Sequence, residues 1–106
     1  MGQIINYKNE GAAGVYCQIK LDSGERVLIS IAADEIKIFK MRLGGLIPGG
    51  TVWEYPDVKE FAKLTIDLDN IKHPLDILLG KVQNYSSINE LQQELDKYVN
   101  NLKRQK

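Results

Sequence analysis

The sequence contains very little cysteine and histidine. There is one cysteine, Cys17, and one histidine, His73, in 106 residues. A disulfide within the chain needs two cysteines, and a zinc site of cysteine and histidine ligands needs three or four, so both are excluded. A single free thiol is typical of proteins in a reducing compartment, and we therefore expect a cytoplasmic protein.

The sequence also has no excess of positive or negative charge, and it has no long apolar run. Fourteen Lys and Arg residues balance fourteen Asp and Glu residues, and residues 1–56 and 57–106 are each neutral. Zero net charge does not support binding to nucleic acid or an anionic membrane by bulk electrostatics. The longest uncharged stretch, between Arg42 and Glu54, is rich in glycine and shorter than the roughly 20 apolar residues of a membrane span. We expect no membrane partner.

The composition is that of a folded globular chain. Hydrophobic residues make up 43% and charged residues 26% of the sequence, which are ordinary values for a globular domain. Two independent cores would leave each half of the chain near the lower limit for stable folding. We therefore predict a single domain over residues 1–106, in which a β-rich part (1–56) and a helical part (57–106) share one core.

Alternation of apolar and polar residues predicts strands over about residues 3–55. The clearest alternation covers residues 15–21 and 26–31 on either side of a short Asp-Ser-Gly turn, which is typical of a β-hairpin. Shorter strands are predicted at residues 3–7 and 51–55. In residues 35–43 the polar side chains change face, which predicts a strand with a bulge or strong twist near Phe39. A helix is the competing prediction for that segment.

The glycine-rich segment 44–50 is predicted to be a loop, with a type II turn at Pro48-Gly49. Gly44 and Gly49-Gly50-Thr51 have the spacing of a P-loop, but Gly50 stands where the phosphate-binding lysine is required. The segment also precedes a predicted strand, whereas a P-loop opens a helix. We therefore expect a structural turn and no nucleotide.

The second half of the chain is predicted to form two or three helices, at about residues 57–64, 74–83 and 87–104. Their start signals are Asp57 as a cap, Pro74 in a first turn, and a capping box from Ser87 to Glu90. In that box the Ser87 hydroxyl accepts from the Glu90 amide and the Glu90 carboxylate accepts from the Ser87 amide. Apolar and acidic residues alternate weakly over residues 65–70, which favours a short edge strand.

Strands followed by helices indicate an α+β fold. The strands are expected to form either a small antiparallel sheet or an SH3-like or OB-like barrel, with the helices covering one face or end.

No arrangement typical of an enzyme, a metal site or a cofactor site is found. The aspartates Asp67, Asp69 and Asp76 are scattered like calcium ligands, but the glycine and glutamate of a calcium loop are missing. Cys17 lies on the apolar face of its strand, where a small buried side chain is expected. We predict a protein without enzymatic activity and without a cofactor. A pocket lined by Trp53 and Tyr55 would be needed for a small ligand.

The leading functional hypothesis is a small protein-interaction or structural module. Several apolar residues lie at positions that alternation does not bury cleanly, or on the stripe of the last helix. The predicted partner surface consists of Phe39, Leu46, Ile47, Leu91, Leu95 and Tyr98. The stripe of the last helix is expected either to pack on the chain's own sheet or to pair with a second copy of the chain.

The alternative hypothesis is a small β-barrel that binds nucleic acid. Cationic grooves with aromatic platforms are the means by which such barrels hold single strands. The predicted surface combines a local basic cluster with aromatic residues of the strands. It consists of Lys37, Lys40, Arg42, Tyr16, Trp53 and Tyr55.

Overall fold

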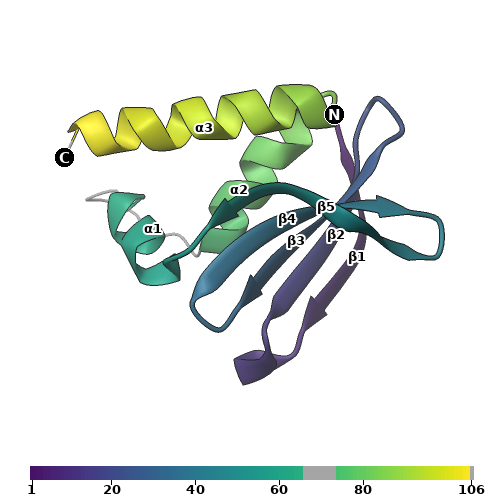
Figure 1. Ribbon diagram of the computed structural model, residues 1–106, viewed down its shortest axis with the longest axis horizontal. Coiled ribbons are helices and arrows are strands. Elements are labelled where there is room, and N and C mark those ends of the chain that lie inside the picture. The colour runs from purple at the N-terminus through teal and green to yellow at the C-terminus, as the bar shows by residue number, and fades with distance from the viewer. Residues whose placement is uncertain (66–73, 106) are drawn as a thin grey trace.

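The computed structural model describes residues 1–65 and 74–105. Five strands come first: β1 (Gln3–Asn9), β2 (Val15–Lys20), β3 (Arg26–Ala32), β4 (Glu35–Arg42) and β5 (Gly45–Tyr55). A 3-10 turn, η1 (Gly11–Ala13), joins β1 to β2. The helices α1 (Val58–Leu64), α2 (Pro74–Asn84) and α3 (Ile88–Gln105) follow (Figure 1). The predicted α+β fold is confirmed. The edge strand predicted at residues 65–70 lies outside the described residues except for Thr65. His73 also lies outside them.

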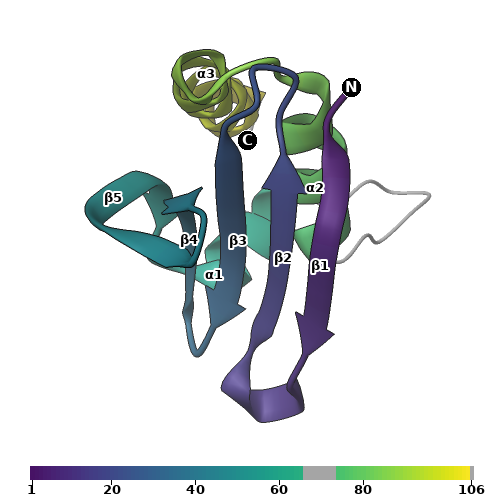
Figure 2. The same ribbon diagram turned by 90° about the vertical axis from the view of Figure 1, so that its right-hand side faces the viewer.

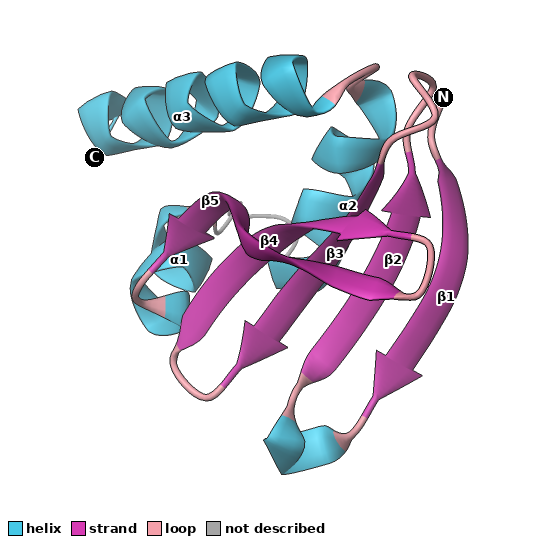
Figure 3. Ribbon diagram, turned by 45° about the vertical axis from the view of Figure 1, so that its right-hand side comes forward, coloured by secondary structure: helices cyan, strands magenta, loops and turns pink. Residues whose placement is uncertain are grey.

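The five strands form one antiparallel sheet in the order β1-β2-β3-β4-β5 (Figure 3). The predicted hairpin is confirmed, since β2 pairs with β3 from Val15 opposite Ile31 to Lys20 opposite Arg26. The sheet is open: β1 and β5 lie at its two edges and do not pair with each other. Of the two predicted architectures, the structure therefore has the open sheet and not the closed barrel. Helices cover the apolar face that a barrel would have closed around itself.

The segment predicted as a loop, residues 44–50, instead belongs mostly to β5. The chain turns at Gly44, which has a φ of 97°, and the strand then begins at Gly45. Phe39 pairs with Thr51 and Met41 with Leu46, so the residues between these partners bulge out of β5. The irregularity predicted near Phe39 is thus confirmed, although the extra residues belong to the partner strand.

Bulges increase the twist of a strand and bend it. The far end of the β4–β5 hairpin accordingly leaves the plane of β1–β3 and points away from α1 (Figure 1). Gly49, with a φ of 69°, supplies a backbone conformation within the bulge that favours glycine.

One face of the sheet and the apolar sides of the helices enclose a single core. Ile29 and Ile38 of the sheet, Phe61 of α1, Leu78 of α2 and Leu91 of α3 are fully buried there. The one-sided burial follows the sequence, because alternate residues of a strand point to the same face. The described part of the chain has no buried charged or polar residue.

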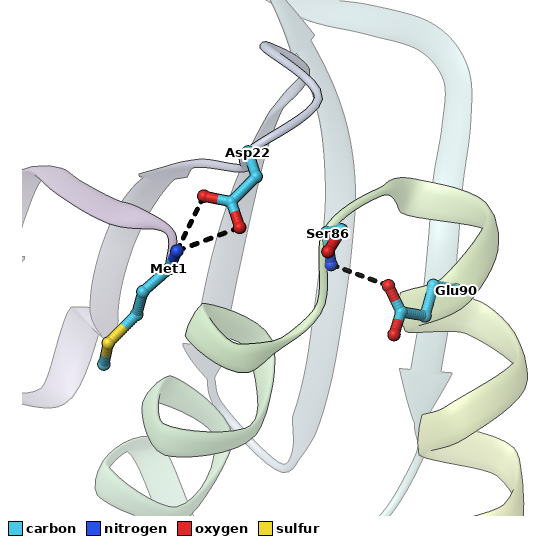
Figure 4. A network of polar contacts seen from close by, with 4 residues as sticks. All are labelled: Met1, Asp22, Ser86 and Glu90. Atoms are coloured by element: carbon cyan, nitrogen blue, oxygen red, sulfur yellow. Dashed lines mark hydrogen bonds and ion pairs between the residues drawn. The ribbon is translucent and has the colours of Figure 1, made fainter.

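The N-terminus of α3 is held by side chains from two parts of the chain. The Glu90 amide donates to the Ser87 hydroxyl at 3.3 Å, as predicted. The Glu90 carboxylate accepts from the Ser86 amide at 2.8 Å (Figure 4), one residue earlier than the predicted partner. The Glu25 carboxylate, from the turn between β2 and β3, accepts from the Ile88 amide at 3.3 Å. This last contact fixes the start of α3 against the sheet.

Candidate functional site

One side of the sheet faces away from the described helices and carries paired apolar side chains. In Figure 2, strands β1, β2 and β3 lie in front of α1 and α2, and no described helix crosses the near side. Leu28 of β3 lies directly opposite Phe39 of β4 on this side. Their neighbours Val27 and Ile38 point into the core and are fully buried. The two apolar side chains are thus paired with each other outside the core.

Strand register arranges the side chains of this surface in three rows that cross the strands. The first row contains Tyr16, Ser30 and Lys37, the second contains Gln18, Leu28 and Phe39, and the third contains Lys20, Arg26 and Met41. We name the central uncharged part of this surface the open face. It is defined by Tyr16, Gln18, Leu28, Ser30, Phe39 and Met41.

Tyr16 is held in place at one end of the open face. Its hydroxyl donates to the Ala13 carbonyl in η1 at 2.8 Å. A side chain at Gly14 would come within 2.9 Å of the same hydroxyl, so glycine is required for this close approach. The ring is half-buried, and its polar end has a partner within the chain.

A shallow hollow lies on the open face beside Tyr16. It is lined by Asn6, Lys8, Tyr16, Gln18 and Leu28, and its cavity volume is about 30 Å³. Pockets for small ligands usually have about 300–1,000 Å³. The hollow is therefore too small for most small-molecule ligands.

Basic side chains surround the open face, and we name Lys8, Lys20, Arg26 and Lys37 the basic rim. Lys37 forms an ion pair with Glu35 at 3.3 Å. No ion pair is present at Lys8, Lys20 or Arg26 within the described residues. Lys20 and Arg26 face each other directly across β2 and β3. Like charges in such positions destabilise a sheet, so this pair has no structural benefit of its own.

The residues of the predicted partner surface fall into two groups. Phe39 and Ile47 are half-buried on the β4–β5 hairpin, and Leu46 is 47% exposed. Leu91 and Leu95 are instead fully buried in the core, so the stripe of α3 packs on the chain's own sheet. The sequence could not distinguish this packing from pairing with a second copy, because both bury the same stripe. Tyr98 is half-buried beside α2, where Lys81 Nζ lies 4.5 Å from the centre of its ring.

Two aromatic residues of the predicted nucleic-acid surface are in the core, which corrects their expected exposure. Trp53 is 7% exposed and Tyr55 is 6% exposed, and the ring of each packs against Phe61, at 6.2 and 5.6 Å between centres. They point inward because β5 pairs them with Ile38 and Ile36, which face the core. These two rings therefore do not form an exposed aromatic platform for bases.

The basic cluster predicted for nucleic acid is divided between two sides of β4. Lys37 pairs with Ser30 on the side of the open face, whereas Lys40 pairs with Val27, which points to the opposite side. Arg42 lies two residues after Lys40 on β4 and therefore points to the same side as Lys40. Sequence proximity had grouped these three cations, but strand alternation separates them.

Two buried groups have raised pKa values that suit structural roles. Burial is the main cause that raises the pKa of Tyr55 to about 12, and a hydrogen bond to Glu60 adds to it. The Tyr55 hydroxyl donates to the Glu60 carboxylate at 2.8 Å. Burial also raises the pKa of the Cys17 thiol, which lowers its reactivity at neutral pH.

Within residues 1–65 and 74–105, no group of three or more His, Cys, Asp and Glu side chains gathers as a metal site would require. Of the predicted acidic residues, Asp76 lies in the first turn of α2, where its charge complements the helix dipole. Asp67 and Asp69 lie outside the described residues.

Comparisons with known proteins give no match: no family model, no curated protein and no solved structure resembles the chain closely enough to count. Among the helices that the structure describes, none has both the length and the apolar character needed to cross a membrane.

Proposed function

We propose that this chain is a non-enzymatic protein-interaction module of one domain that contacts its partner through the open face. The observation that carries the proposal is the direct pairing of Leu28 with Phe39 on the side of the sheet that no described helix covers. Single exposed apolar residues are ordinary, but neighbouring ones that form a patch mark contact surfaces. Met41 extends the pair along β4, and Leu46 lies opposite Met41 on β5.

A contact surface for a macromolecule accounts for the shape of this region better than a site for a small molecule. The hollow beside Tyr16 is small, whereas protein interfaces are broad surfaces with an apolar centre and a polar rim. The open face has that arrangement, since Leu28 and Phe39 are central and charged residues surround them. The buried, unpaired Cys17 is consistent with a cytoplasmic location.

The alternative proposal, binding of single-stranded nucleic acid, has less support. Stacking of bases needs exposed aromatic rings, and burial of Trp53 and Tyr55 leaves Phe39 and the half-buried Tyr16 on the side of the open face. The separation of Lys37 from Lys40 and Arg42 further weakens the predicted basic groove.

Photo-crosslinking in the cells that produce the protein tests the proposal. A benzophenone amino acid at position 39 replaces one aromatic ring by another and should give discrete adducts with protein. The same group at Gln92, an exposed position on α3, is the matched control and should not give those adducts. Leu28→Lys places a charge directly opposite position 39 and should remove them, while circular dichroism confirms that the variant is folded.

Two results would contradict the proposal. Adducts at position 39 that are destroyed by nuclease would favour the nucleic-acid alternative. Identical adducts from positions 39 and 92 would mean that the open face has no preferred role in contacts.

A further inference from the structure

The charges of the open side of the sheet are unevenly distributed, which restricts the chemistry of a partner. The basic rim places four cations around the open face, and the acidic residues on the same side are Glu35 and Glu54, opposite Ala32 and Lys37 in the register. Glu35 already forms an ion pair with Lys37. Because the whole chain is neutral, this local excess of positive charge is matched by a negative excess elsewhere on the chain.

The pair Lys20–Arg26 is the least explained feature of this distribution. These two side chains are direct cross-strand neighbours, and within the described residues neither has an acidic partner. Directly opposed like charges cost stability. Side-chain pairs that lower the stability of a fold without a compensating contact are characteristic of functional surfaces. An anionic group bound between them would neutralise the repulsion.

The spacing of the rows corresponds to the repeat of an extended chain. Lys37, Phe39 and Met41 follow one another at every second residue of β4, and the three rows are therefore each about 7 Å apart. An extended protein segment presents its side chains to one side with the same two-residue repeat. A segment that lies parallel or antiparallel to β3 would place three successive side chains over the three rows.

The chemistry of the rows then determines the side chains that fit. Lys20–Arg26 in the third row is cationic and Leu28–Phe39 in the second row is apolar, whereas Lys37 in the first row already has Glu35 and Glu54 as acidic neighbours. We infer that the open face binds an extended acidic segment of a partner protein, with an acidic residue two positions from an apolar one. The carboxylate of this segment lies between Lys20 and Arg26, and its apolar side chain contacts Leu28 and Phe39. This inference rests on the proposed function and adds the partner's chemistry to it.

A titration monitored by nuclear magnetic resonance tests the inference on the full chain. The probe is a capped peptide, Ser-Glu-Ser-Leu-Ser-Glu-Ser, which carries the pattern. The matched control, Glu-Ser-Ser-Leu-Glu-Ser-Ser, has the same composition, but neither of its glutamates is two residues from the leucine. We expect the probe to shift the amide signals of β2, β3 and β4 around Leu28 and Phe39, and to bind several-fold more tightly than the control.

Charge reversal on the two sides of the sheet distinguishes the basic rim from other cations. Lys20→Glu together with Arg26→Glu should weaken binding of the probe by about tenfold or more. Lys40→Glu, a cation of the opposite side, should leave binding within about twofold of the unmodified chain. Increased salt should weaken binding to the unmodified chain because exposed charges are screened.

The possible failures of the inference and of the proposed function can be told apart. If the peptide does not bind but crosslinking at position 39 still captures protein, the partner is not acidic and only the inference is overturned. If an oligothymidylate shifts the same signals more strongly than the peptide, both are overturned. If the signals shift on dilution of the protein alone, the occupant is a second copy, which also overturns the inference.

Discussion

Leu28 and Phe39 lie opposite each other across β3 and β4, and both are half-buried on the side of the sheet that no described helix covers. Their neighbours along the strands, Val27 and Ile38, are fully buried on the other side. One step along each strand therefore separates a residue of the core from a residue of the candidate contact surface. The contribution of the two sides to stability can be measured independently.

Variants at adjacent positions of β4 should differ strongly in stability. Ile38→Ala removes a fully buried side chain and should lower the free energy of unfolding by about 2–5 kcal/mol. Phe39→Ser removes a half-buried side chain from the open face and should lower it by about 1 kcal/mol or less. Urea denaturation of both variants measures the difference. Equal losses would mean that Phe39 belongs to the core, and the open face would then be structural.

The packing of α3 predicts loss of stability without change of oligomeric state. Leu95 is fully buried, so Leu95→Ala should cost about 2–5 kcal/mol of the free energy of unfolding. Gln92→Ala, on the exposed side of the same helix, should change it by less than about 0.5 kcal/mol. Light scattering during size-exclusion chromatography should give the same mass for both variants and the unmodified chain. A lower mass for Leu95→Ala would indicate that the stripe of α3 pairs copies of the chain.

Patterns within one element predicted the fold well. The hairpin of β2 and β3 follows from simple alternation, because a period of two has one structural interpretation. The irregularity near Phe39 was also visible, since the polar residues of β4 change sides. The start of α3 was predicted because its cap is formed by Ser87 and Glu90, which are close in sequence.

Relationships between elements were not predictable from the sequence in the same way. Trp53 and Tyr55 alternate with Glu54, and alternation alone does not say which side of a strand meets the core. Glu25 contacts the amide of Ile88 across 63 positions of sequence, and no local pattern indicates such a contact. The candidate contact surface was recognised only in part, because Tyr16, Leu28 and Phe39 come together through the register of three strands.

The turn between β3 and β4 contains a strained residue whose replacement should stabilise the protein. Ala33 has a φ of 52°, and it is the one non-glycine residue with a positive φ in the described part of the chain. Left-handed backbone conformations are unfavourable for alanine and better tolerated by asparagine. Ala33→Asn should raise the free energy of unfolding by about 0.5–1 kcal/mol. Ala12→Asn in η1, where φ is not positive, is the control, and thermal denaturation should show no gain for it.

Tyr55 predicts how the stability of the protein depends on pH in alkaline solution. Burial and the Glu60 carboxylate raise its pKa from 10 to about 12 in the folded state. Between these two values the unfolded chain loses the proton while the folded chain keeps it, so unfolding becomes more favourable as pH rises. The stabilising effect is complete below pH 10 and is lost as pH approaches 12.

Urea denaturation at increasing pH in this range measures the effect of Tyr55. Tyr55→Phe removes the ionisable group and should reduce the decline of the free energy of unfolding with pH. Glu60→Gln keeps a hydrogen-bond acceptor but removes the negative charge that raises the pKa of Tyr55. It should therefore reduce the decline by a smaller amount than Tyr55→Phe. A decline that is the same in all three proteins would show that Tyr55 does not hold its proton more strongly when folded. The buried rings of Tyr55 and Phe61 would then have to be more accessible to water than their packing indicates.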